Sequence, residues 1–460
     1  MGTRLVMRDL AEHRWLRAYF FASAGGLVVL AVFALGVAVG TFKLFPYSLL
    51  ERGAAAARDW IRYPRHHVRL RPEKFLVPQP AAASTAAQPA VRLPGAFDGV
   101  TFVDGFFGRS TGMRLLAMNG DVLHEWPVAF NDLWPDATHV ERAIHDWDAQ
   151  IHGALLYPNG DVVFNFQYGG LARIDACGRP IWRLAEQTHH SVYEDENGHL
   201  WVPSRWRHDE PSSALPGAPV PYYEDLVLEL SPDGRVLREI SVLDVIVEGG
   251  QSGLLYANGE HGAVLNLPLD GDFTHLNDVD VLEPSIAAAF PMFEAGDLLL
   301  SLRNLNLLLV VDPDTAVVKW WMVGPYLRQH DPDFLPNGRI SVFDNRRDGA
   351  GGKALGGSRI LEIDPATREI SVVYGDREDQ RFYTETMGEH QHLPNGNVLI
   401  TESEAGRAFE VAPSGEIVWS YVNRWDEESA ALIGRAVRYP ASYAESIEAE
   451  SCNDAKKQEG

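Results

Sequence analysis

A pair of turns recurs along this chain, and the recurrence constrains the fold more than any other feature. The first turn is an Asn-Gly dipeptide followed by an apolar run, and it begins at Asn159, Asn197, Asn337 and Asn395. The second turn contains Asp, Ser or Pro and precedes a strand rich in Val, Ile or Trp, at residues 175–178, 231–234, 312–315, 364–367 and 413–415. The unit returns after roughly 45–60 residues, which is typical of a four-stranded propeller blade.

Residues 96–424 have room for six such units. We therefore expect an all-β fold, a six-bladed β-propeller, over this range. A two-sheet sandwich is the alternative, but sandwiches lack this recurrence of paired turns.

The N-terminal segment predicts a membrane anchor. Residues 18–42 contain no charge, and as a helix they would extend roughly 37 Å, longer than the ~30 Å hydrocarbon core. A cleaved signal peptide, usually shorter, is the alternative. Basic residues are nearly balanced on the two sides, so charge does not set the orientation. We expect residues 1–17 in the cytoplasm and the propeller on the periplasmic or extracytoplasmic side, because the large domain looks like one that works outside the cytoplasm.

The flanking segments of the propeller differ from it in composition. Residues 43–95 form a connector that ends in a Pro/Ala-rich tether. Residues 425–460 begin with an Ala-rich helical pattern and end in polar residues, which predicts a surface helix and a polar tail. The two cysteines, Cys177 and Cys452, lie in such different contexts that we do not expect them to pair.

The net charge restricts the partners. Lys and Arg number 40 and Asp and Glu 63, which gives a formal net charge of −23. Such a chain repels the phosphate backbone, so nucleic acid is excluded as a partner. An anionic substrate would need a local cluster of cations.

Histidines gather at one point of the repeat, shortly before the strands that open several blades. They are His152, His189, His190, His275, His330, His390 and His392. The first strands of propeller blades surround the central channel, so these side chains are expected to converge there. Each histidine alone has a simpler explanation, a hydrogen bond to a neighbouring blade. The His-x-His spacing at 390–392 also suits a metal, but the signal is weak and we expect no metal.

Arginines accompany the histidines. Arg303, Arg328, Arg346 and Arg347 all lie close to the same point of the repeat. In an acidic domain this arrangement predicts a funnel for an oxyanion.

Four segments carry a family resemblance. They are HHSVYEDENGHLWV, HLNDVDVLEP with SLRNLNLLLVVDPDT, RQHDPDFLPNGRISVFDNR and GEHQHLPNGNVLITESEAGRAFEV. In order and spacing they resemble the bacterial arylsulfotransferases, and this chain resembles a membrane-anchored member. The resemblance implies a six-bladed propeller that transfers sulfuryl groups without a nucleotide cofactor. It also implies a histidine in the channel that is transiently sulfated.

The same resemblance suggests roles for individual residues. His275 matches the family's His-x-Asn segment, and His330 matches its Gln-His segment and would act as acid and base. The arginine after FDN is Arg347 or Arg346. The nucleophile comes late in the propeller and should be His390 or His392. The residues expected to bind substrate are His190, Asn277, Arg303 and Arg328.

The predicted function is transfer of a sulfuryl group from an aryl sulfate ester to a phenolic or other hydroxyl acceptor through a sulfohistidine. The predicted partners are these small molecules and the membrane, and the sequence leaves a homo-oligomer open. The alternative is a non-catalytic, membrane-anchored propeller that serves as a binding or scaffold module of the cell envelope. Substituting the histidines would leave such a module unaffected.

Overall fold

The computed structural model describes residues 3–42, 57–58, 60–68, 71–78, 90–108, 110–212, 215, 220–256 and 271–449. The chain forms two units, residues 1–70 and 71–460. The first unit contains α1 (Thr3–Phe42) and α3 (Pro64–His67). Within α1, the stretch Ala18–Val39 has a mean hydropathy of 2.3 and is long enough to cross a membrane. A membrane anchor and a signal sequence both meet this criterion.

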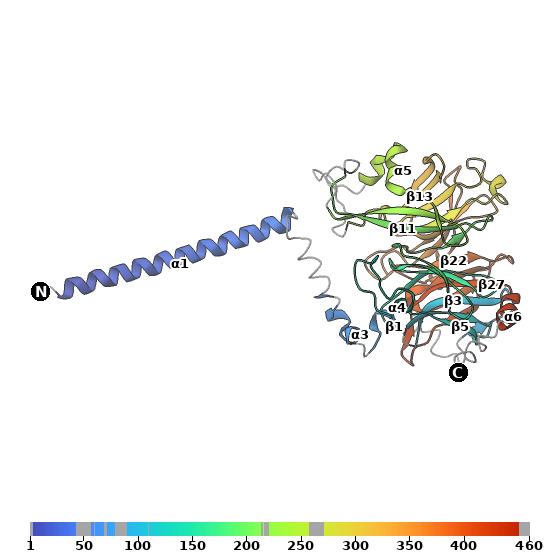
Figure 1. Ribbon diagram of the computed structural model, residues 1–460, viewed down its shortest axis with the longest axis horizontal. Coiled ribbons are helices and arrows are strands. Elements are labelled where there is room, and N and C mark those ends of the chain that lie inside the picture. Colours follow the sequence, from blue (N-terminus) through green and yellow to red (C-terminus); the bar gives the residue numbers. More distant parts are fainter. Residues whose placement is uncertain are drawn as a thin grey trace. The chain divides into compact units, whose positions relative to one another are not determined.

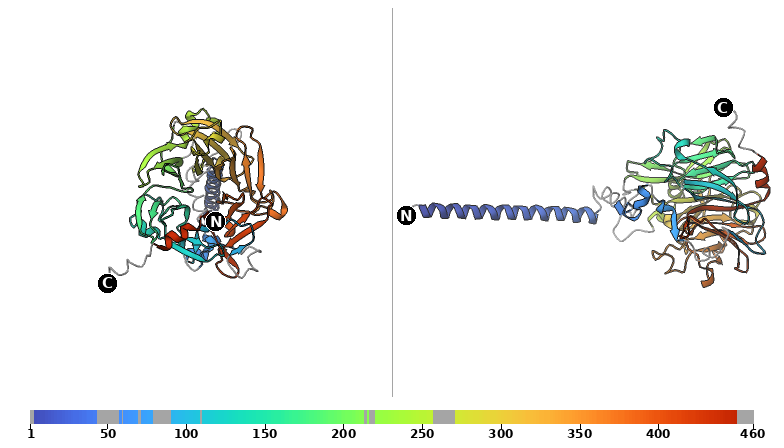
Figure 2. Two further views of the ribbon diagram at one scale, coloured as in Figure 1. Left: turned by 90° about the vertical axis from the view of Figure 1, so that its right-hand side faces the viewer. Right: turned by 90° about the horizontal axis from the view of Figure 1, so that it is seen from below.

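The second unit is a six-bladed β-propeller, as the repeat predicts (Figures 1 and 2). The left view of Figure 2 shows the blades arranged in a ring. Blade 1 consists of β27 (Ile433–Tyr439), β3 (Val100–Phe107), β4 (Ser110–Leu116) and β5 (Val122–Pro127). Blade 2 consists of β6 (Ile151–Leu156), β7 (Val162–Phe166), β8 (Gly170–Ile174) and β9 (Pro180–Leu184). Blade 3 consists of β10 (Tyr193–Glu194), β11 (Leu200–His208), β12 (Tyr222–Leu230) and β13 (Val236–Ser241).

The other three blades follow the same antiparallel order. Blade 4 consists of β14 (Leu276–Val281), β15 (Leu298–Leu302), β16 (Leu307–Asp312) and β17 (Val317–Val323). Blade 5 consists of β18 (His330–Phe334), β19 (Ile340–Asp344), β20 (Arg359–Ile363) and β21 (Ile370–Tyr374). Blade 6 consists of β22 (Glu389–His392), β23 (Val398–Glu402), β24 (Arg407–Val411), β25 (Ile417–Val422) and β2 (Ala90–Arg92). The first strands of several neighbouring blades contact one another, which places them around the channel.

Both ends of the domain close the ring. The C-terminal β27 pairs with β3 as the first strand of blade 1, and the N-terminal β2 adds a fifth strand to blade 6. The helix predicted at the start of residues 425–460 is therefore wrong: β26 (Ser429–Ala431) and β27 lie there. Hydrogen bonds to the distant β3 outweigh the local helical preference of the Ala-rich segment. A short helix, α6 (Ser442–Ala449), follows these strands.

Tryptophans on the outer strands join one blade to the next. The indole nitrogens of Trp126, Trp182, Trp320 and Trp419 each donate to a main-chain oxygen of the following blade, at N···O distances of 2.9–3.1 Å. Trp419 donates to Met118, and so connects blade 6 to blade 1. This contact explains why the second turn of the repeat leads into Trp-containing strands.

We expect Trp419→Ala to lower the free energy of unfolding by about 3–5 kcal/mol, because it empties a buried site and leaves the Met118 oxygen without its donor. Urea unfolding followed by tryptophan fluorescence measures this change. The matched control is Trp206→Ala, since Trp206 is 58% exposed, and it should stay within about 0.5 kcal/mol of the parent. Equal effects of the two substitutions would contradict this account of blade closure.

The state of Cys177 differs from the expectation. Cys177 lies between β8 and β9 and is disulfide-bonded. The only other cysteine in the sequence, Cys452, lies outside the described residues. The expectation that the cysteines do not pair is therefore wrong for Cys177. The two sequence contexts say nothing about proximity in space, which is why the prediction failed.

Candidate active site

Irregular pairing at the ends of the first strands directs side chains toward the channel. The register shifts between Ile151 and Gly153 in β6, between Leu276 and Asp278 in β14, and between His330 and Asp333 in β18. A bulge breaks the strict alternation of a strand and re-aims the side chains beside it. Positive φ angles of 56° at His190 and 54° at His275 have a similar local effect.

Four histidines from different blades meet at this level of the channel. The ring centroid of His190 lies 3.9 Å from that of His152, 5.0 Å from that of His275 and 6.2 Å from that of His330. A cavity of about 20 Å³ lies beside them. It is lined by His152, His190, Ser191, Asn277, Asp278, His330, Asp331, Met387, Gly388, Glu389 and Gly434. The predicted convergence of histidines is present for these four.

His275 forms a pair with an acidic residue. Its Nδ1 lies against the carboxylate of Asp272, which implies that Nδ1 carries a proton. The Nε2 atom is buried and has no hydrogen-bond partner among the described residues. A carboxylate in this position stabilises the imidazolium form.

His330 has neutral partners instead. Its Nδ1 lies 2.7 Å from Oδ1 of Asn345 and 3.1 Å from the main-chain oxygen of Arg328. Its Nε2 is also buried and unpartnered within the described chain. Both His275 and His330 therefore present a bare Nε2.

Burial keeps the imidazoles of the cluster neutral. It lowers the pKa of His330 to about 3 and that of His152 to about 3, and lowers the pKa of His190 well below its usual range. Burial also lowers the pKa of His275, and Asp272 opposes that effect. Near pH 7 the rings of His152, His190 and His330 thus carry lone pairs rather than charges.

Arg303 supplies the positive charge of the site. It begins the turn after β15, and its main-chain nitrogen donates to the oxygen of His275 at 3.1 Å. Burial lowers the pKa of Arg303, but a guanidinium stays charged in proteins. Its charge lowers the pKa of both His275 and His330, so it lies within electrostatic reach of both. Its Nε is buried without a partner in the described part of the chain.

The other predicted arginines occupy different surroundings. Arg328 donates to the side chain of Asn304, and Arg347 forms a 2.8 Å ion pair with Glu385. Burial is the largest cause that lowers the pKa of Arg303. The charges of Arg328 and Arg347 lower this pKa further, so both arginines lie near the site.

Arg346 does not join the cluster. It lines a separate cavity of about 360 Å³, together with Lys353 and Arg381. Of the two arginines that follow FDN, the geometry favours Arg347.

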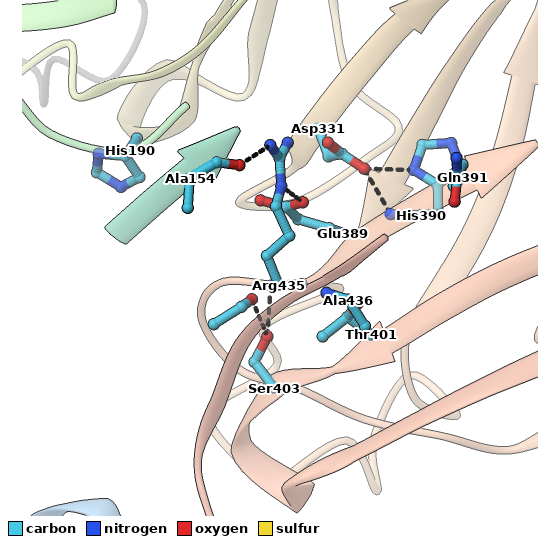
Figure 3. Close-up of polar contacts among 12 residues, drawn as sticks. Ala154, His190, Asp331, Glu389, His390, Gln391, Thr401, Ser403, Arg435 and Ala436 are labelled. Atoms are coloured by element: carbon cyan, nitrogen blue, oxygen red, sulfur yellow. Dashed lines mark hydrogen bonds and ion pairs between the residues drawn. The ribbon is translucent and has the colours of Figure 1, made fainter. Parts of the chain in front are cut away.

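The geometry argues against His390 as the nucleophile, whereas His392 has a buried Nε2 without a partner among the described residues but does not line the cavity. The side chain of His390 is 0% exposed. Its Nδ1 bonds Oδ2 of Asp331 at 2.8 Å (Figure 3). Its Nε2 bonds Oγ of Ser341 at 2.8 Å, so both ring nitrogens have partners. Successive residues of β22 face opposite sides, and Glu389, not His390 or His392, lines the cavity. The His390 ring instead connects blade 6 to blade 5.

Asn277 lines the cavity, as expected of a residue that binds substrate. Its Nδ2 donates to the main-chain oxygen of Gln329 at 2.7 Å, so the atom left free is the buried Oδ1. An oxygen acceptor repels an oxyanion, although it can receive a hydroxyl proton. The Oδ1 of Asn277 therefore suits a hydroxyl group better than an oxyanion.

Carboxylates form the other wall of the cavity. Burial raises the pKa of Asp278 well above its usual range and raises that of Glu389 to about 7. Arg435 contacts Glu389 and also donates to the main-chain oxygen of Ala154 at 3.1 Å (Figure 3).

One group of side chains has the spacing of a metal site. Ligating atoms of Asp331, Asp333 and His390 lie within 4.8 Å of one another. Both ring nitrogens of His390 already have hydrogen-bond partners. The arrangement therefore suits a hydrogen-bonded network better than metal coordination.

Sequence reasoning did not assign roles to two partners of the cluster, Asp272 and Asn345. Both were visible in the sequence, Asp272 three residues before His275 and Asn345 as the last residue of FDN. Their relation to the histidines depends on loop geometry, which the spacing does not specify.

The fold and the site define a six-bladed propeller whose channel holds a cluster of neutral histidines beside a buried arginine. The family model for arylsulfotransferases (ASST) matches residues 152–424, more than half of the chain. The protein belongs to this family, whose reaction is aryl sulfuryl transfer.

Solved structures with similar folds are distant in sequence. A protein of unknown function from Bacteroides caccae is 12% identical, with a TM-score of 0.46 over 74% of this chain and 98% of that one. A virginiamycin B lyase from Staphylococcus aureus is 11% identical, with a TM-score of 0.37 over 72% of this chain and 87% of that one. No curated protein sequence matches the chain.

Proposed function

We propose that this protein transfers a sulfuryl group from an aryl sulfate ester to a phenolic or other hydroxyl acceptor through a sulfated His330, without a nucleotide cofactor. The observation that carries the proposal is the bare Nε2 of His330, which is buried within electrostatic reach of Arg303. A neutral imidazole with a free lone pair is a nucleophile, and a fixed cation stabilises charge on the sulfuryl oxygens.

The partners of the two histidines support a division of roles. His330 faces a neutral amide and stays uncharged, as a nucleophile must. His275 faces Asp272, which stabilises the imidazolium that forms when His275 holds a proton. We therefore assign nucleophilic attack to His330 and proton transfer to His275.

The reaction then consists of two displacements. The Nε2 lone pair of His330 forms an N–S bond as the S–O bond to the aryl group breaks, and the phenolate takes the Nε2 proton of His275, which enters this step as the imidazolium beside Asp272. The acceptor hydroxyl next gives its proton to His275 and attacks sulfur, and the N–S electron pair returns to Nε2. Arg303 stays beside the three sulfuryl oxygens in both steps, and the Oδ1 of Asn277 can orient the acceptor hydroxyl.

The N-terminal helix supports an anchored enzyme, and we place its propeller on the extracytoplasmic side. The disulfide at Cys177 agrees with this location, since disulfides persist in oxidising compartments. A homo-oligomer stays a prediction.

Turnover tests the proposal directly. The full-length protein in detergent, given 4-nitrophenyl sulfate and phenol, should release nitrophenol and form phenyl sulfate. The control is His145→Ala, which removes an exposed histidine and should leave turnover unchanged. Absence of turnover with every aryl sulfate tried, together with a stable protein partner in membrane pull-downs, would favour the scaffold alternative.

Substituting Asp272 tests whether His275 transfers the proton. In Asp272→Asn the imidazolium loses its counter-charge, so protonation of the leaving phenolate weakens. We expect cleavage of phenyl sulfate to slow by about 100-fold, and cleavage of 4-nitrophenyl sulfate by less than about tenfold, because nitrophenolate leaves without a proton. Single-turnover release of the two phenols measures this difference. Equal losses for both donors would contradict the assignment.

A further inference from the structure

Asn345 is held in place by contacts on both polar atoms of its side chain and on its main-chain oxygen. It follows β19, and its side chain is fully buried. Its Nδ2 donates to the main-chain oxygens of Thr384 at 3.0 Å and Met387 at 2.7 Å, and its own main-chain oxygen accepts from Ser358 at 3.1 Å. Carbonyl oxygens only accept, so the amide cannot turn around without placing oxygen against oxygen.

This orientation determines the tautomer of His330. Because the Asn345 oxygen faces Nδ1 of His330, and the second neighbour of Nδ1 is also a carbonyl oxygen, Nδ1 must hold the proton. The lone pair is then on Nε2, the atom with no partner in the described residues.

We propose that Asn345 is a positioning residue that fixes His330 as the neutral tautomer with its lone pair on Nε2, and so makes it the nucleophile rather than an acid or base. This inference rests on the proposed function. It explains why two histidines with the same free nitrogen have different tasks: the acceptor behind His330 is an amide and the one behind His275 is a carboxylate.

The neutral amide also matters for the sulfated intermediate. Once Nε2 carries the sulfuryl group, the ring is cationic, and an amide oxygen can accept the Nδ1 hydrogen bond but cannot take the proton. The ring therefore stays a good leaving group, and it departs as neutral imidazole when the acceptor attacks. A carboxylate in the same place would share the proton and make the N–S bond harder to break.

The variant that tests this is Asn345→Asp. The other charged or titratable groups that face His330 are Arg303, the rings of His152, His190 and His275, and the carboxyl groups of Asp278, Asp331 and Glu389 across the cavity. None of these changes in the variant. A new carboxylate next to Nδ1 should raise the pKa of His330 by about 1–3 units. Donor cleavage in the variant should therefore decline at higher pH than in the parent protein as the solution is acidified.

Asn423→Asp is a matched control. Asn423 is a buried amide whose Nδ2 also donates to two main-chain oxygens, those of Phe106 at 3.0 Å and Ala431 at 3.1 Å. It faces no histidine of the cluster. Each variant loses two donor contacts to main-chain oxygens, so any loss of folding stability should be similar, and only Asn345→Asp should change the pH profile.

The experiment combines two readouts on the full-length protein. Histidine ¹⁵N spectra, assigned with His330→Gln, should show Nδ1–H and a bare Nε2 for His330 at pH 7. Single-turnover cleavage of 4-nitrophenyl sulfate should be slower at pH 5 than at pH 8 in Asn345→Asp, by up to about tenfold for a rise of about 3 units in the pKa of His330, and nearly equal at the two pH values in Asn423→Asp. The opposite tautomer in the spectra, or identical pH profiles of the two variants, would overturn the inference. The expected tautomer in a protein that never cleaves an aryl sulfate would support the positioning role and defeat the proposed function.

Discussion

His330→Ala should lower the rate of donor cleavage by about 10⁴-fold or more, because it removes the atom that forms the covalent bond. Rapid-quench measurement of nitrophenol release in the first turnover detects this loss separately from acceptor chemistry. The effect should be equal in the presence and absence of phenol, because the first displacement does not involve the acceptor.

The comparison with other histidines makes this prediction specific. His145→Ala should retain the rate of the parent protein, since its side chain is exposed. His330→Ala should also keep the far-UV circular dichroism of the parent, which separates loss of the nucleophile from loss of the fold. A variant that folds and retains more than about a tenth of the parent rate would contradict the assignment of His330.

Arg303→Ala should produce the second largest loss, about 10²–10³-fold in kcat, because the sulfuryl oxygens lose the buried cation that faces them. Arg303→Lys should recover only part of the rate, since an ammonium lacks the planar fork of the guanidinium. Steady-state kinetics with 4-nitrophenyl sulfate and phenol measures both variants.

Arg346→Ala is the control for Arg303. Both positions were candidates from the sequence, but Arg346 lines a separate cavity with Lys353 and Arg381. We expect its kcat to stay within about twofold of the parent. An equal loss of activity in Arg346→Ala and Arg303→Ala would contradict the placement of the oxyanion site beside Arg303.

The fold was predictable because propeller blades repeat their turns. The Asn-Gly turns at Asn159, Asn197, Asn337 and Asn395 each connect the first two strands of a blade, and so indicated four of the six blades. The closing strand was not predictable in the same way. The segment 429–439 looks helical because alanines recur along it, and the partner of its second half, β3, lies more than 300 positions away in the sequence. Pairing at such a distance leaves no local signal.

The repeat predicted which segments meet in the channel, but it did not predict which side chains face the cavity. The positions of His190, His275 and His330 before blade-opening strands correctly indicated convergence in the channel. The same argument failed for His390 because β22 is a regular strand, in which a shift of one residue reverses the face. Side-chain direction there depends on register, and register depends on contacts that the spacing of motifs does not contain.

The sequence also did not show that His275 and His330 have different hydrogen-bond partners. A motif shows that two histidines occupy family positions, but the contrast between Asp272 and Asn345 appears only when the loops are in place. That contrast reversed the assignment of roles, since the sequence favoured His330 as acid and base and placed the nucleophile later in the chain.

The central claim is that His330 carries the sulfuryl group between donor and acceptor. The direct measurement is to quench the full-length protein during turnover of 4-nitrophenyl sulfate without acceptor, keep the digest at alkaline pH, and map the sulfated residue by mass spectrometry. The account predicts an N-sulfonate on the peptide that contains His330, and its disappearance when phenol is added before the quench. Sulfate on the peptide that contains His390 and His392, or on His275, would contradict it.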